Sequence, residues 1–268
     1  MIRKTLCILI QTLAVILVQL TSTKVIAETC SSLTMAGPPD FPPVVWSDYR
    51  ETRGAARDLL EQALNKQGIE LKTDHVGGYR RVLKALTDGR IQLITGIPKT
   101  PETSAIATFS STPLYIHSLT VLTKRSHGKK PHNWNDLLEL KGAMPDQLSV
   151  EEIFHNQQKP KKLIRTFTPN LALKMLKIGR VDYTIYPNIQ DDLLVSLLNL
   201  EGTLEKLPLI TQKVPVFVAF SKNIDCSISI QQLNTDLQKL TKSGEAEKIL
   251  NDSLYKWMSY QLKKRESL

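Results

Sequence analysis

The chain has 268 residues and a formal net charge of +9 at pH 7. Without its first 27 residues it has 241 (268 minus 27), a length that can bury the core of one or two domains. The remaining formal charge is +6, because Arg3, Lys4 and Lys24 leave and no acid does. No basic stripe interleaved with aromatic residues is present, so we expect no nucleic-acid binding. The positive charge indicates either a solvated face or a preference for an anionic ligand or envelope surface.

Residues 1–27 resemble a secretory signal peptide. Two basic residues precede an apolar run at 6–20, and residues 25–27 end in the small-residue pattern of a cleavage site. An uncleaved membrane anchor is the alternative, but the run is shorter than the roughly 20 residues that span a bilayer. We therefore expect an exported protein.

The mature chain keeps two cysteines, Cys30 and Cys226. In an oxidising compartment an even pair indicates a disulfide, whereas two free buried thiols are the alternative. Neither the cysteines nor the five histidines have the spacing of metal ligands. We therefore expect no metal ion and no cofactor.

The first part of the mature chain predicts alternating strands and helices. Residues 33–36 form a strand candidate, and the proline-rich segment 37–43 can neither extend that strand nor enter a helix. An apolar stripe at helical spacing predicts a helix over 55–66, with Gly68 near its end. Residues 69–76 alternate as a second strand does.

A helix from Tyr79 ends at Asp88-Gly89, and the short apolar run 91–97 indicates a strand buried in a parallel sheet. The loop 96–103 follows it at the carboxyl end, where open α/β sheets bind ligands. A further strand ends at Lys124.

The second half continues the alternation after a polar connection at 126–133. A capping box predicts a helix over 149–154. A strand candidate at 163–167 precedes a helix that Thr168-Pro169-Asn170 begins and that runs to Ile178. The remaining elements are a strand at 214–220, helices at 230–240 and 246–258, and a frayed tail at 263–268.

One pattern of helix, glycine and short strand occurs twice. Its glycines are Gly89 and Gly179, which lie 90 positions apart (179 minus 89). The repeat indicates two lobes of similar α/β build that share a cleft.

A set of ordered motifs resembles a known family. The motifs are ALTDGRIQLI at 85–94, Thr100, Phe109-Ser110, Pro113 with Tyr115, and VLTK at 121–124. Together they resemble the bacterial periplasmic solute-binding proteins of the amino-acid-binding type, extracellular solute-binding protein family 3. The resemblance implies an α/β, two-lobed periplasmic-binding-protein-like (type II) fold with two hinge-crossing strands, near 119–124 and 216–221. Lobe 1 would comprise 28–121 and 218–262, and lobe 2 would comprise 122–217.

The resemblance also implies the protein's activity and surroundings. Members capture a small-molecule ligand by hinge closure in the periplasm, and the closed form docks on the permease of an ABC transporter or on a sensor kinase. We expect a monomer without enzymatic activity. Cys30 and Cys226 would lie in the same lobe, as a disulfide requires. The sequence departs from the family pattern at residues 142–146, where a proline stands in a segment that is usually a strand. We therefore expect a shortened or irregular strand there.

The two charged anchors of the family are missing. Thr103 stands where family members have an arginine that clamps the ligand carboxylate, and Pro187 stands where they have an aspartate that holds the ammonium. Burying either charge without a partner is costly. We therefore expect no free α-amino acid in the usual pose, unless Lys99, Arg80 or Arg53 reaches the ligand.

The resemblance and the remaining polar and aromatic groups favour a neutral, weakly charged or aromatic solute. For Phe41 and Trp46, ordinary loop packing is the alternative. The predicted ligand-binding residues are Phe41, Trp46, Tyr79, Gly96, Thr100, Thr103, Asn170, Tyr186 and Asn188.

Two other functions stay open. A degenerate member that binds no small molecule would act as an interaction or signalling protein of the envelope. A periplasmic dehydratase-like enzyme would need a positioned acid or base, for which Glu102 and His117 are the nearby candidates.

Overall fold

The structure is a computed structural model. It describes residues 29–126, 128, 131–148, 153–154, 158–187, 195, 200 and 202–266, without the side chains of 208–212 and 265–266. The expected signal peptide at 1–27, Asn188 and most of the helix expected at 149–154 lie outside these residues.

A long mixed sheet runs through the molecule, with the strand order β10-β9-β11-β8-β12-β6-β1-β5 and with β7 beside β12. A small antiparallel sheet has the order β2-β3-β4. The strands are β1 (Ser32–Ala36), β2 (Asp40–Phe41), β3 (Val45–Ser47), β4 (Thr52–Arg53), β5 (Glu70–Thr73), β6 (Leu93–Ile97), β7 (Ala107–Phe109), β8 (Tyr115–Lys124), β9 (Lys141–Pro145), β10 (Lys162–Thr166), β11 (Tyr183–Pro187) and β12 (Leu204–Ser221).

Helices pack beside the strands of the long sheet. They are α2 (Ala55–Asn65), α3 (Tyr79–Thr87), α4 (Pro101–Ile106), the 3₁₀ helix η1 (Trp134–Leu137), α6 (Pro169–Lys177), α8 (Ile230–Lys242) and α9 (Glu245–Glu266). In the part of the chain that the structure describes, no helix is both long and apolar enough to cross a bilayer.

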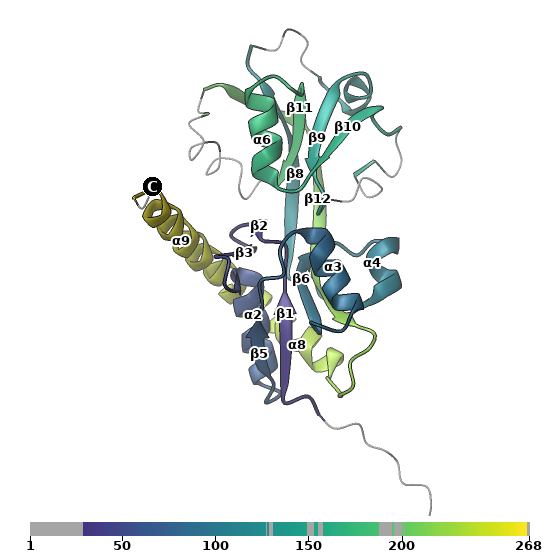
Figure 1. The fold of residues 1–268 in the computed structure, drawn as a ribbon, viewed down its shortest axis with the longest axis vertical. Helices are drawn as coiled ribbons and strands as arrows, with labels where there is room; N and C mark the ends of the chain where they lie inside the picture. The colour runs from purple at the N-terminus through teal and green to yellow at the C-terminus, as the bar shows by residue number, and fades with distance from the viewer. Residues whose placement is uncertain are drawn as a thin grey trace, which may run out of the picture.

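The two long antiparallel strands β8 and β12 join two lobes (Figure 1). The first lobe contains β1, β5, β6 and β7 with α2, α3, α4, α8 and α9, and the second contains β9, β10 and β11 with α6 (Figure 1). Within each lobe the shorter central strands pair in parallel, as β1 does with β5 and β6, and β9 with β10 and β11. The two-lobed α/β fold with two crossing strands, expected from the sequence, is confirmed.

Local sequence accounts for the core of the first lobe. All five residues of β6 are buried, as is typical of a parallel strand covered on both faces. On α2 the apolar stripe of Leu59, Leu60, Ala63 and Leu64 is buried as well. The helices predicted at 55–66 and from Tyr79 to Asp88 are therefore present within a residue or two.

A disulfide ties the beginning of β1 to the segment before α8. The Sγ atoms of Cys30 and Cys226 are 2.05 Å apart, and the Cys30 N–H donates to the Ser227 carbonyl oxygen at 3.1 Å. The bond closes a loop with a sequence separation of 196 residues. The two chain segments that build the first lobe are thereby linked covalently.

Two expectations about individual elements were wrong. The strand expected to be short or irregular near 142–146 is the regular five-residue β9, which pairs in parallel with β10 along its whole length. Pro145 is its last residue, where a missing N–H interrupts the ladder least. The tail expected to fray from 263 is helical to Glu266 as part of α9.

Candidate ligand-binding cleft

A cavity of about 520 Å³ lies between the two lobes. Its volume falls within the roughly 300–1,000 Å³ of small-molecule sites. Three of its residues lie just past the ends of parallel strands: Asp146 directly after β9, Phe167 directly after β10, and His75 two residues after β5. The carboxyl ends of such strands are where open α/β sheets bind ligands. The lining residues are Pro39, Asp40, Ser47, Tyr49, His75, Gly77, Gly78, Tyr79, Arg80, Arg81, Asp146, Phe167 and Thr168.

Asp146 carries the main electrostatic link across this cleft. Its side chain is only 8% exposed, with Arg80 Nε of the first lobe 3.4 Å from Oδ2 and Arg165 Nε of the second lobe 3.4 Å from Oδ1. Arg165 Nη2 also donates to the backbone oxygens of Asp146 and Leu148, at 2.8 and 2.6 Å. The buried carboxylate is therefore neutralised by two guanidinium groups, one from each lobe.

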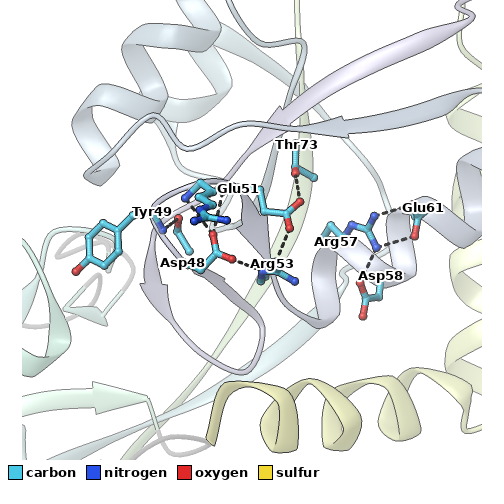
Figure 2. Close-up of polar contacts among 10 residues, drawn as sticks. Asp48, Tyr49, Glu51, Arg53, Arg57, Asp58, Glu61 and Thr73 are labelled. Carbon is cyan, nitrogen blue, oxygen red and sulfur yellow. Dashed lines mark hydrogen bonds and ion pairs between the residues drawn. The ribbon is translucent and has the colours of Figure 1, made fainter. Parts of the chain in front are cut away.

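The turn between β3 and β4 presents Tyr49 to the cleft from a fixed backbone. Asp48 Oδ1 accepts the N–H groups of Arg50 and Glu51 at 3.0 and 3.1 Å, and Asp48 Oδ2 accepts Arg53 Nε at 2.7 Å (Figure 2). Desolvation raises the pKa of Asp48, but these donors outweigh it and hold the pKa below its usual value. Tyr49 has φ of 71°, in the left-handed region that residues other than glycine rarely adopt. Its ring points away from this polar cluster (Figure 2).

Asp40 and His75 add titratable groups to the same wall. His75 Nδ1 lies 2.7 Å from Ser47 Oγ, in a hydrogen bond that orients the imidazole ring. Loss of hydration raises the pKa of Asp40, and the nearby Lys264 and His75 oppose this only in part. Lys264 Nζ also lies 5.0 Å from the centroid of the Tyr49 ring. The end of α9 therefore brings positive charge to the edge of the cleft.

Tyr79 is the one predicted ligand residue among the described residues that line this cavity. The loop expected to receive the ligand around Gly96 lies instead against Val45. A Cβ atom added at Gly96 would be 2.9 Å from Val45 Cγ1, and one at Gly37 would be 2.4 Å from Val45 Cγ2. The Val45 side chain thus fills the space beside the carboxyl ends of β1 and β6.

Thr100 and Thr103 form the capping box of α4. Thr103 Oγ1 accepts the Thr100 N–H at 2.8 Å and donates to the Pro98 carbonyl oxygen at 3.1 Å, while Thr100 Oγ1 accepts the Thr103 N–H at 3.1 Å. Thr103 is fully buried. Its hydroxyl is engaged in the helix cap, and the ligand contact expected of Thr103 stays a prediction.

Two of the predicted aromatic walls, Phe41 and Trp46, are packed in the interior. The buried ring of Phe41 meets His117 edge-on at 4.6 Å between centroids, and the buried ring of Trp46 lies 5.5 Å from Tyr260 of α9. Tyr186 is buried in the same hydrophobic cluster as Trp46. These contacts agree with the alternative of ordinary packing.

Asn170 is half-buried in the first turn of α6. Sequence reasoning missed Tyr49, Phe167, Arg81 and Asp146 as cleft residues. One usable signal existed for Phe167, the last residue of the strand candidate 163–167, because it directly precedes a helix N-cap and hence lies at a strand's carboxyl end.

A second cavity of about 600 Å³ lies between the β3–β4 turn and α9, within the first lobe. Its charged groups largely neutralise one another: Arg53 pairs with Asp48 and Glu51, and Lys256 pairs with Asp58. The cleft between the lobes is the better candidate for a ligand site, because both lobes contribute to it.

These two lobes, the crossing strands and the cleft define the architecture of a solute-binding protein. Residues 33–257 match the family of bacterial extracellular solute-binding proteins, family 3, and the chain belongs to this family. No curated protein matches the sequence.

Solved structures share the fold at low sequence identity. A histidine kinase sensor domain with similarity to periplasmic binding proteins has a TM-score of 0.71 at 19% identity, over 84% of this chain and 96% of that one. An ancestral arginine-binding protein bound to glutamine has a TM-score of 0.68 at 20% identity, over 84% and 98%. AbpA from Streptococcus pneumoniae, an ABC transporter substrate-binding protein bound to L-arginine, has a TM-score of 0.66 at 23% identity, over 84% and 95%.

Proposed function

We propose that this chain captures a small solute between its lobes in the periplasm and presents the closed form to a membrane permease or sensor. The observation that carries the proposal is the cavity of about 520 Å³ to which both lobes contribute side chains. Rotation of one lobe about β8 and β12 would change the shape of this cavity, so ligand binding and lobe closure are coupled. In this proposal residues 1–27 are removed on export, and the mature chain acts as a monomer.

The proposed solute is not a standard free amino acid held in the family's usual pose. The Thr103 hydroxyl is committed to the α4 cap, and Pro187 at the end of β11 has no charged group. An α-carboxylate or α-ammonium at these two places would lose its hydration without gaining a partner. Aromatic or weakly charged solutes fit the lining better.

Delivery to a sensor is a second candidate, favoured by the likeness to a histidine kinase sensor domain. An enzymatic role has little support from the geometry. Burial lowers the pKa of His117 to about 3, and His117 is only 1% exposed, so it is out of reach of a substrate. We infer that the protein binds and releases its solute unchanged.

Native mass spectrometry of protein purified from the periplasm tests the proposal. A bound small molecule that is lost on denaturation would support solute capture and would give its mass. An empty protein whose melting temperature stays constant across amino acids, amines and aromatic acids would favour the interaction-protein alternative. Phe167→Ala, on the cleft wall, should weaken retention of the bound molecule, whereas Tyr255→Ala, an exposed residue of α9 outside the cleft, should not.

A further inference from the structure

Some charged side chains that line the cleft form ion pairs with one another, but the guanidinium group of Arg81 has no carboxylate partner among the described residues. We propose that the captured solute is an aromatic carboxylate without an amino group, anchored by Arg81. This inference rests on the proposed function and narrows its ligand to one chemical class.

Arg81 is a cation of the cleft that no acid pairs with in the part of the chain that the structure describes. Its side chain lies over Gly77, where an added Cβ atom would be 3.3 Å from Arg81 Cδ and 3.5 Å from Nη1, and both residues line the cavity. Within the described residues no carboxylate pairs with its guanidinium group, in contrast to Arg80, which contacts Asp146. A planar guanidinium group suits a carboxylate through two parallel hydrogen bonds.

The carboxylates of the cleft already have positively charged side chains beside them. Asp146 is contacted by Arg80 and Arg165, and Asp40 has Lys264 and His75 in its electrostatic neighbourhood. An ammonium group on the solute would therefore compete with existing cations for either aspartate. The lining thus favours an anion and disfavours both an amine and an α-amino acid.

Aromatic rings face the cleft from both lobes. Residues Tyr49 and Phe167 are 69% and 71% exposed, far more than is usual for large aromatic residues, and both line the cavity with Tyr79. The Tyr49 backbone is held in its left-handed conformation by the Ser47 hydroxyl, which accepts the Tyr49 N–H at 3.0 Å. Exposed rings on two sides of a cavity suit a flat aromatic solute, which would remove them from water on closure.

The test is isothermal titration calorimetry of the mature, oxidised protein with four probes that share a phenyl ring. Phenylacetate is the anion, phenylacetamide its neutral analogue, 2-phenylethylamine the cation and L-phenylalanine the zwitterion. We expect phenylacetate to bind about ten- to a hundredfold more tightly than phenylacetamide, as a charge-assisted pair provides. The amine should bind most weakly.

Two variants in α3 distinguish a direct contact between Arg81 and the solute carboxylate from a general effect of the protein's positive charge. Arg81→Gln should abolish the preference for phenylacetate over phenylacetamide. Lys84→Gln removes the same charge from an exposed position of α3 outside the cleft and should preserve that preference. Phe167→Ala should weaken the binding of phenylacetate and of phenylacetamide by a similar factor, because it removes an aromatic ring of the cleft and leaves the Arg81 guanidinium group in place.

Different results would overturn different statements. Tighter binding of L-phenylalanine or of the amine, or an unchanged preference in Arg81→Gln, would reject the aromatic carboxylate class. If native mass spectrometry finds a retained solute while no probe binds, the proposed function stands and the class is wrong. If no probe binds and no solute is retained, both are wrong.

Discussion

Arg80 at the start of α3 and Asp146 after β9 form an ion pair across the cleft, with Nε 3.4 Å from Oδ2. The two partners differ in burial: the Arg80 side chain is 77% exposed and the Asp146 side chain 8%. The contact joins the lobes at a place where no covalent or sheet connection exists. It can therefore influence lobe closure more than the stability of either lobe.

We predict that Arg80→Gln opens the cleft with little effect on folding. Arg165 still neutralises the buried Asp146 carboxylate in this variant, so losing the largely exposed Arg80 should cost no more than about 1 kcal/mol of the free energy of unfolding. Small-angle X-ray scattering without ligand should show a larger radius of gyration for the variant, while its urea midpoint stays close to that of the parent. Lys84→Gln is the control, and equal radii for Arg80→Gln and the parent would contradict the prediction.

The capping box of α4 provides a second prediction. Thr103→Ala should lower the free energy of unfolding by about 1–2 kcal/mol, because the Thr100 N–H and the Pro98 carbonyl oxygen lose their partner. Thr103→Ser keeps the hydroxyl and should recover most of this loss. Solute affinity in the alanine variant should match the parent, and a loss of affinity without a loss of stability would restore Thr103 as a ligand residue.

His117 should make the protein less stable in mild acid. Burial lowers its pKa from 6.5 to about 3, so between these values the unfolded chain binds a proton that the folded chain excludes. The free energy of unfolding therefore falls as pH decreases through this window, by up to about 1.4 kcal/mol per pH unit from this residue.

Replacing His117 tests whether this histidine causes the loss of stability in acid. His117→Leu removes a side chain whose two ring nitrogens have no hydrogen-bond partner in the described structure. The variant should be more stable than the parent at pH 7, by about 1 kcal/mol. The difference in free energy of unfolding between His117→Leu and the parent should be larger when urea unfolding is repeated at pH 5. For His132→Gln, at an exposed position, the difference from the parent should not change between the two pH values.

The disulfide gives a fourth prediction. Replacing Cys30 and Cys226 together by alanine should lower the free energy of unfolding by about 2–5 kcal/mol, since the bond closes a loop of 196 residues in the unfolded chain. The parent protein under reducing conditions should unfold at the same urea concentration as the variant. Identical midpoints for oxidised and reduced parent would show that the bond contributes nothing.

Elements with a strong local signal were predicted well from the sequence. The Thr168 hydroxyl caps α6 as expected by accepting the Leu171 N–H, and the segment Val214–Phe220 forms the end of β12, which pairs with β6 of the first lobe. In both cases neighbouring residues along the chain contain the necessary information: a cap followed by a helical stripe, or a short apolar run.

The cleft lining was predicted poorly, because it depends on contacts between distant segments. Thr100 and Thr103 looked like free hydroxyl groups, but their spacing of three suited a helix cap equally well. Trp46 looked like a cleft wall until α9, more than 200 residues later, supplied Tyr260 beside it. Tyr49 and Phe167 carried no motif that distinguishes an exposed ring from a buried one.

The sequence by itself determined the α/β alternation and the repeat that indicates two lobes, and it has Thr103 and Pro187 where the family resemblance predicts charged anchors. Periodicity, caps and glycines act over a few residues, so they can be recognised without coordinates. Only the tertiary structure decided that Val45 fills the space beside Gly96 and that Arg80 meets Asp146. It also left Arg81 as a cation without a carboxylate partner among the described residues. Such pairings follow from how the lobes pack, which no local pattern specifies.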